Sequence, residues 1–118
     1  MTATTFFEIS GPDAGRLRAF YRGALGLPVG DPDPSGYALV PPDGGIGGAI
    51  WDGTATAGSY AVFYVQVDDV DAAVDRVTAG GGAVVLAPRP HGPARIAHVS
   101  DPAGNRVGLF QWTGQPPG

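Results

Sequence analysis

The sequence contains no cysteine and no lysine, and charged side chains make up only 15% of it. Without cysteine the chain cannot form a disulfide, a thiolate metal site or a thiol nucleophile. Its seven basic residues are all arginines scattered along the chain, and the formal net charge is −4. Because nucleic-acid binding requires clustered basic residues that neutralise phosphates, we expect no nucleic-acid partner.

Long apolar runs are also missing. No stretch approaches the ~20 apolar residues that a helix needs to span a bilayer. Residues 1–5 lack the basic and apolar regions of a signal peptide. We therefore expect a cytoplasmic protein without a membrane partner. Alanine, glycine, arginine and proline are abundant while lysine is absent, which is typical of a GC-rich bacterial genome.

The residues that are present describe one globular domain. The chain has 118 residues, 43% of them hydrophobic, which is the size and composition of a single folded domain. It contains 20 glycines and 12 prolines, and their clusters separate periodic apolar segments, so we expect many turns. Strands are predicted over residues 6–9, 37–40, 46–51, 60–67, 83–86, 96–100 and 106–112.

Two predicted helices follow the same plan. Asp13 is placed to cap a helix over residues 14–25 that Gly26 ends, and Asp69 is placed to cap a helix that begins at Val70. The separation between the two aspartates equals that between Ile9 and Val65 in the preceding strands, which indicates an internal repeat. The apolar stripes that should face the core are Leu17, Phe20, Tyr21 and Ala24 in the first helix and Val70, Ala73, Val74 and Val77 in the second.

Three segments resemble the vicinal oxygen chelate superfamily, which comprises glyoxalases, bleomycin resistance proteins and extradiol dioxygenases. They are residues 20–27 (FYRGALGL), 65–73 (VQVDDVDAA) and 101–105 (DPAGN). The resemblance implies an α+β fold in which two βαβββ modules form a curled, incomplete barrel around a central cavity. We place the modules at about residues 4–53 and 59–113 of a single domain, 1–118. The resemblance also implies a homodimer.

Enzymes of this superfamily hold a divalent metal with His, Gln or Glu side chains on the strands. The resemblance assigns these ligand positions to Phe6, Val62 and Gly108, and to a residue near Gly48 or Ala49. None of these side chains carries the oxygen or nitrogen donors that a divalent ion requires. We therefore predict a site without a metal or another cofactor.

Glu8 is the most informative polar residue because it is an acid inside an apolar strand. Strand alternation places it on one face together with Phe6 and Ser10. Glu8 could serve as a general base or accept a hydrogen bond from a ligand hydroxyl or amine. The structural alternative is an ion pair with Arg95 or Arg106.

A second face is formed by alternate residues of the strand over residues 60–67, from Tyr60 to Gln66. His98, on a neighbouring predicted strand, is a candidate proton shuttle or a packed histidine. A relocated metal site formed by Glu8, Gln66 and His98 stays open as an alternative. The predicted catalytic residues are Glu8 and His98, and the predicted ligand-binding residues are Phe6, Glu8, Tyr37, Trp51, Val62, Tyr64, Gln66 and Phe110.

These residues favour a protein that binds a small organic molecule, such as an antibiotic or another natural product, without a metal. The alternative is a metal-independent lyase, isomerase or cyclase with Glu8 as general base. A metal-dependent glyoxalase or dioxygenase is disfavoured by the missing ligands. The sequence leaves open which ligand binds, and whether the modules pair within one chain or between two.

Overall fold

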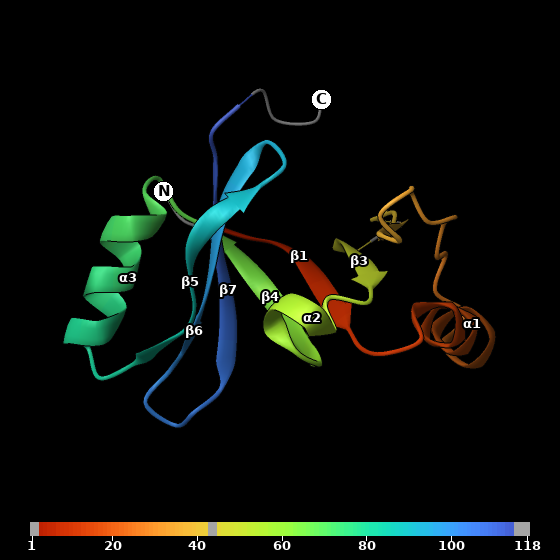
Figure 1. Cartoon of the computed structure of the whole chain (residues 1–118), viewed down its shortest axis with the longest axis horizontal. Coiled ribbons are helices and arrows are strands. Elements are labelled where there is room, and N and C mark those ends of the chain that lie inside the picture. The colour runs from red at the N-terminus through yellow and green to blue at the C-terminus, as the bar shows by residue number, and fades with distance from the viewer. Residues whose placement is uncertain (1–2, 43–44, 115–118) are drawn as a thin grey trace. The chain divides into compact units, whose positions relative to one another are not determined.

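The computed structural model of the chain describes residues 3–42 and 45–114. These residues divide into two compact units (Figure 1). The N-terminal unit comprises Phe6–Val62, and the C-terminal unit comprises residues 63–114 together with residues 3–5. Strands β1 (Ala3–Ser10) and β4 (Tyr60–Gln66) therefore contribute residues to both units.

In the N-terminal unit, a short sheet is built on β1. Strand β3 pairs in parallel with β1 and antiparallel with β2. An isolated antiparallel bridge joins Ala38 of β2 to Pro32, in the segment between α1 and β2. The remaining elements of this unit are α1 (Ala14–Leu25), β2 (Ala38–Val40), β3 (Gly47–Trp51) and the short helix α2 (Thr54–Ala57), which the sequence does not predict.

The C-terminal unit shows the complete βαβββ order. Strand β7 pairs in parallel with β4 and antiparallel with β6, and β6 pairs antiparallel with β5. Helix α3 packs along these strands, as Figure 1 shows. The elements after β4 are α3 (Val70–Ala79), β5 (Ala83–His91), β6 (Ala94–Ser100) and β7 (Arg106–Trp112). The predicted α+β class with its repeated module is thus confirmed.

The predicted helix ends are confirmed as well. The Asp13 side chain accepts a hydrogen bond from the Arg16 amide at 3.2 Å, and Asp69 accepts one from the first turn of α3 at 3.1 Å. Gly26 ends α1 with φ 70, a left-handed conformation that costs glycine little. These contacts satisfy amide and carbonyl groups that a helix end leaves without intrahelical partners.

The apolar stripe of α1 is only partly confirmed. Leu17 and Tyr21 pack against the core of the N-terminal unit, as predicted. Phe20, by contrast, is 55% exposed, and its ring lies edge-on against Tyr21 with centroids 5.1 Å apart. Ala24 is exposed as well, and the predictions for Phe20 and Ala24 are wrong because the stripe is wider than the surface that α1 covers. The buried core of this unit is Val29, Ala38, Val40 and Ile50.

The stripe of α3 matches the prediction more closely. Val70, Ala73 and Val74 are buried, and Val77 packs against the same cluster from its edge. The strands supply the other buried members of this core, which are Val67, Ala97, Val99 and Leu109. The core of the C-terminal unit therefore lies between α3 and the strands.

Strand β5 is longer than predicted, because it continues past Leu86 to His91. It carries Pro88 and Pro90 and shows two register shifts against β6. Proline is compatible with a strand that pairs on one side only, as β5 does at the end of the strand order. The sequence also predicts a turn over residues 41–45 and a frayed tail over residues 113–118; residues 43–44 and 115–118 of these segments lie outside the described residues.

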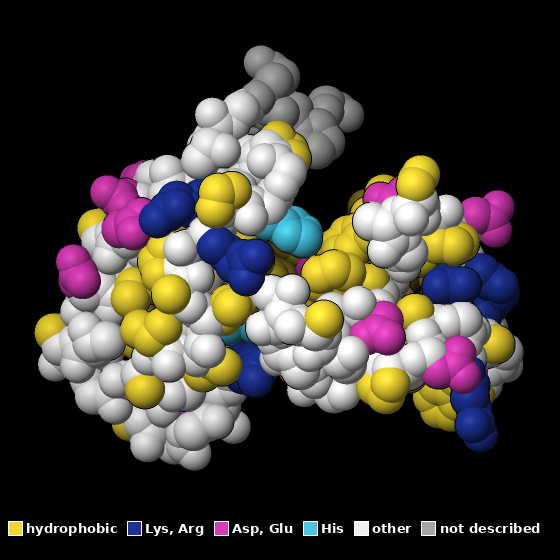
Figure 2. All heavy atoms as spheres, in the orientation of Figure 1, with side chains coloured by type: hydrophobic (Ala, Val, Ile, Leu, Met, Phe, Trp, Pro, Cys, Tyr) yellow, Lys and Arg dark blue, Asp and Glu magenta, His cyan; other side chains and the backbone are white. Residues whose placement is uncertain are grey.

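The described surface carries few charges, and Figure 2 shows them scattered among hydrophobic and other side chains. Large hydrophobic side chains are exposed at several places rather than in one element. They are Phe20, Leu25, Leu39, Ile46, Phe63, Val84 and Val85. Among the described residues, no helix is long and apolar enough to cross a membrane.

Candidate ligand-binding site

The site is built around Glu8 in the middle of β1. Strand alternation directs Phe7 and Ile9 toward α1, where both pack against the core of the N-terminal unit. Glu8 and Ser10 point to the opposite face, and both are buried, Glu8 with only 2% of its surface exposed. The prediction that these two residues share one face is confirmed.

Two phenol groups bind the Glu8 carboxylate. The Tyr37 hydroxyl donates to Oε2 at 2.5 Å, and the Tyr60 hydroxyl donates to Oε1. Each carboxylate oxygen therefore accepts a hydrogen bond from a different part of the chain. Hydrogen bonds to a charged group are stronger than neutral ones and offset part of the cost of burying a carboxylate.

A tryptophan joins the two tyrosines. Trp51 Nε1 donates to the Tyr60 hydroxyl at 3.3 Å, and the Trp51 and Tyr37 rings meet edge to face with centroids 5.4 Å apart. The three aromatic residues are half-buried, whereas Glu8 is buried. We call Glu8, Tyr37, Trp51 and Tyr60 the Glu8 cluster. It combines one buried anion with three aromatic rings that keep part of their surface exposed.

Local hydrogen bonds hold the rings of the cluster in place. Asp33 accepts from the Tyr37 amide at 3.0 Å and from Ser35, which fixes the turn before Tyr37. Ser10 accepts from the Gly53 amide at 2.9 Å and donates to the Gly58 carbonyl at 3.0 Å. The second pair of bonds ties β1 to the segment that connects Trp51 with Tyr60.

The pKa of the Tyr37 phenol lies well above its usual range. Burial is the largest cause, followed by the negative charge of Glu8 and the hydrogen bond to it. Tyr37 therefore stays protonated at neutral pH and acts as a hydrogen-bond donor.

The C-terminal unit brings together a different set of the predicted residues. The Tyr64 hydroxyl and His98 Nε2 are hydrogen-bonded at 2.6 Å, and the Phe110 ring lies edge-on to Tyr64 with centroids 6.3 Å apart. All three are buried to 2% exposure or less. Gln66 is half-buried beside Phe110 in the strand register. Such burial is typical of a packed histidine, and the catalytic role of His98 stays a prediction.

The positions that the resemblance assigns to metal ligands do not fit a metal in this chain. Phe6 and Val62 offer hydrocarbon only. A Cβ on Gly48 would lie 2.5 Å from the ring of Phe7, and a Cβ on Gly108 would lie 2.5 Å from the ring of Tyr64. These rings fill the space that a ligating side chain needs. Among the described residues, no group of three or more histidines, aspartates or glutamates could hold a metal ion.

One of the two arginines that the sequence offers as ion-pair partners of Glu8 is paired with another acid. Arg95 forms an ion pair with Asp71, with Nε–Oδ2 and Nη2–Oδ1 distances of 2.7 and 3.0 Å. Strand alternation predicts that Tyr60 shares a face with Val62 and Tyr64, but nothing in the sequence singles it out as a partner of Glu8. Its role depends on a contact with Glu8 across 52 positions of the chain. Locally, the sequence gives only the position of Tyr60 at the start of a predicted strand, which does not identify Glu8 as its partner.

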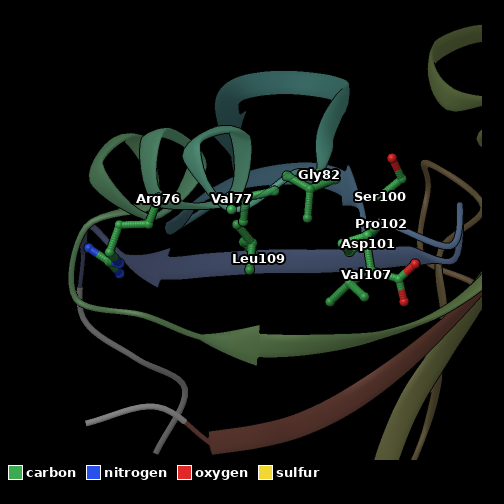
Figure 3. A pocket seen from close by; sticks show the side chains of 10 residues that line it. Arg76, Val77, Gly82, Ser100, Asp101, Pro102, Val107 and Leu109 are labelled. Carbon is green, nitrogen blue, oxygen red and sulfur yellow. The ribbon is translucent and has the colours of Figure 1, made fainter.

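A pocket of about 280 Å³ lies in the C-terminal unit beneath the end of α3 (Figure 3). Val77 on α3 and Leu109 on β7 point toward each other in its wall. The wall is the edge of the hydrophobic core of this unit, and none of the predicted ligand-binding residues lines it.

The chain matches the Glyoxalase/Bleomycin resistance protein/Dioxygenase superfamily over residues 5–109. It therefore belongs to this superfamily, as the three sequence segments predicted. Solved structures agree in fold. A Vibrio splendidus 12B01 member of the superfamily is 19% identical, with 94% of this chain and 99% of that chain covered and a TM-score of 0.62.

Two further similar structures are of proteins described as enzymes with different activities. A Legionella pneumophila protein described as an NAD-dependent benzaldehyde dehydrogenase has a TM-score of 0.67, with 14% identity over 91% of this chain and 97% of that chain. Methylmalonyl-CoA epimerase from Mycobacterium tuberculosis has a TM-score of 0.59, with 19% identity over 96% of this chain and 88% of that chain. Likeness at this identity shows the fold alone.

A curated relative is similar over a shorter segment. "Putative glyoxylase CFP32" of Mycobacterium tuberculosis (strain CDC 1551 / Oshkosh) is 49% identical over 49 residues, which are 41% of this chain and 19% of the relative. The matched segment thus spans about a fifth of the length of that protein.

Proposed function

We propose that this protein binds a small organic molecule of the antibiotic or natural-product kind at the Glu8 cluster. One observation carries the proposal: a carboxylate buried to 2% exposure is held by two phenols whose rings, with that of Trp51, remain half-buried. Ligand sites in proteins combine aromatic and apolar walls with a few oriented polar groups. The Glu8 cluster has this composition within one unit.

The parts of the cluster have separate roles. The rings of Tyr37, Trp51 and Tyr60 supply apolar contact area, which provides most of the binding free energy. Glu8 fixes the two phenols and orients polar groups of the ligand through them. Phe6 and Val62 in this unit, and Tyr64, Gln66 and Phe110 in the other, stay predictions that rest on the family resemblance for the first pair and on strand alternation and aromatic character for the other three.

The test is a thermal-shift screen of the whole chain against a library of small natural products. A ligand that binds the folded state raises the melting temperature by mass action. We expect hits whose shift is lost in Glu8→Gln and kept in Asp75→Asn. Asp75 is an exposed residue of α3 and gives the same change in net charge. A library without hits, or hits that shift Glu8→Gln as strongly as the native chain, would contradict the proposal.

Acid–base catalysis is the second candidate, because the same carboxylate lies in contact with two phenol donors. Glu8 would take a proton from a bound substrate and a tyrosine would return one. Each carboxylate oxygen accepts one hydrogen bond from a phenol, so a substrate proton would have to reach the second lone pair of an oxygen or displace a phenol. Turnover of a hit compound that Glu8→Gln abolishes, while binding persists, would favour catalysis over simple binding.

A further inference from the structure

We infer that the ligand of the Glu8 cluster is an organic cation, such as a quaternary ammonium or a protonated alkylamine. The inference rests on the proposed function and adds the charge of the ligand to it. Its basis is the composition of the cluster: one buried carboxylate accepts hydrogen bonds from the hydroxyls of Tyr37 and Tyr60, and Trp51 contacts both tyrosines.

Aromatic rings attract cations through the negative potential of their faces. Tryptophan is the strongest of the three aromatic residues in this respect, and tyrosine also contributes. Trp51 and Tyr37 lie edge to face, so their rings present walls at a steep angle, 70°, to each other. Two such walls can contact one ammonium group from different sides.

Negative charge adds to the attraction. Hydrogen bonds from Ser35 and Tyr37 hold the pKa of the Asp33 carboxyl below its usual range, and hydrogen bonds from Thr54 do the same for Asp52. Both carboxylates are therefore ionised at neutral pH, one in the turn before Tyr37 and one directly after Trp51. The Asp33 charge acts on the Tyr37 phenol, where it contributes to the raised pKa.

The same charges disfavour other ligand classes. An anionic ligand would be repelled by Glu8 and by the ionised carboxylates beside the two rings. A neutral ligand would gain the apolar contacts but not the electrostatic ones. Because cation–π attraction is stronger at partly desolvated sites, a positive charge should add about tenfold to the affinity of an otherwise identical ligand.

The experiment compares choline with 3,3-dimethyl-1-butanol, which replaces the quaternary nitrogen with carbon and has nearly the same shape. Each compound is titrated into the whole ¹⁵N-labelled chain, and binding is followed by NMR. We expect choline to bind about tenfold more tightly than the neutral alcohol. The preference should become smaller in Glu8→Gln, which keeps the rings but loses the buried charge, and persist in full in Asp75→Asn.

A second variant guards against a folding defect in Glu8→Gln. Trp51→Leu keeps the carboxylate but removes one ring, and it should weaken choline more than the neutral alcohol. Equal affinity of the native chain for the two compounds, no binding of choline, or a preference that is undiminished in Glu8→Gln would overturn the cationic assignment. The library screen distinguishes the proposed site from the proposed charge of its ligand. Neutral hits that depend on Glu8 would support the site and contradict the cationic ligand.

Discussion

At the residue scale, the hydrogen bonds from two phenols to Glu8 decide whether a carboxylate can stay buried in β1. A buried ionised group is costly unless it is hydrogen-bonded, and loss of one partner leaves part of that cost uncompensated. Tyr37 and Tyr60 each supply one such bond. The cluster is therefore structural support and candidate binding site at the same time.

The first prediction concerns these two tyrosines. Tyr37→Phe and Tyr60→Phe each remove one hydroxyl and keep the ring, so we expect each to lower the free energy of unfolding by about 1–3 kcal/mol. Urea denaturation followed by circular dichroism measures the change. Tyr21→Phe, on α1 outside the cluster, is the matched control and should change stability by less. Equal losses at all three tyrosines would show that the bonds to Glu8 contribute nothing specific.

The second prediction concerns pH. The pKa of Tyr37 is raised in the folded state, chiefly by burial and by Glu8, so the folded state holds this proton more tightly than the unfolded state does. The resulting stabilisation is complete below the unfolded pKa of about 10 and is lost as the pH rises above it. Unfolding free energies measured between about pH 8 and 11 should fall more steeply in the native chain than in Tyr37→Phe. Parallel curves would refute the raised pKa.

Residue identities could be predicted for most of the cluster, but their contacts could not. Glu8 is conspicuous as an acid in an apolar strand, and Tyr37 and Trp51 are aromatic residues on predicted strands. The phenols that bind Glu8 lie 29 and 52 positions away in sequence. Alternation gives the face of a residue but not which distant residue reaches it. For that reason the sequence also offered Arg95 as a partner for Glu8, whereas Arg95 pairs with Asp71.

At the element scale, the two parallel strand pairs share one packing device. In β1 and β3, Phe7 is in register with Gly48, and in β4 and β7, Tyr64 is in register with Gly108. In each pair the aromatic ring covers the glycine so closely that a methyl group would lie 2.5 Å from it. The device occurs in both units but not at equivalent positions, because the repeat that aligns Ile9 with Val65 aligns Tyr64 with Glu8 rather than with Phe7.

The third prediction tests this device. Gly108→Ala should lower the free energy of unfolding by about 1–3 kcal/mol, because Tyr64 is buried, bonded to His98 and unable to move aside. Gly48→Ala should also destabilise, but by less, because Phe7 is only half-buried. Gly23→Ala, on exposed α1 with open space at its Cβ, is the control and should stabilise by about 0.5–1 kcal/mol. Chemical denaturation measures the free energy of unfolding of the three variants. An unchanged value in Gly108→Ala would refute the close contact between Gly108 and the Tyr64 ring.

Element boundaries were most predictable where a side chain or a glycine marks them. Asp13, Gly26 and Asp69 set the ends of α1 and α3 through local hydrogen bonds and backbone conformation, which depend on a few neighbouring residues. Helix α2 and the end of β5 were not predictable in this way. The prolines of β5 are residues that usually end a predicted strand, although a strand that pairs on one side only tolerates them.

At the scale of the whole molecule, the superfamily is established by the match over residues 5–109, and the fold follows from it. The chemistry of the superfamily does not follow, because function depends on the site rather than the fold. The positions for metal ligands carry hydrocarbon side chains, or glycines whose space is filled by aromatic rings. Homodimer formation and cytoplasmic location stay predictions.

The fourth prediction concerns metals. Titration with Zn²⁺, Ni²⁺, Mn²⁺ or Fe²⁺ should leave the melting temperature of the chain unchanged, because a specific metal site would stabilise the folded state by mass action. Elemental analysis of the purified protein accompanies the titration. Near-stoichiometric metal, or a melting temperature that rises with one ion, would contradict the prediction of a site without a metal.

The most direct test of a metal-independent ligand site at Glu8 uses the two tryptophans of the chain. Trp51 belongs to the Glu8 cluster, whereas Trp112 packs against Phe110 in the C-terminal unit and serves as an internal reference. The indole N–H resonances of both are followed by NMR while the best hit from the library is added in the presence of EDTA. Our account predicts a saturable shift of the Trp51 resonance while that of Trp112 stays in place. A shift of Trp112 alone, or binding that disappears with EDTA, would contradict it.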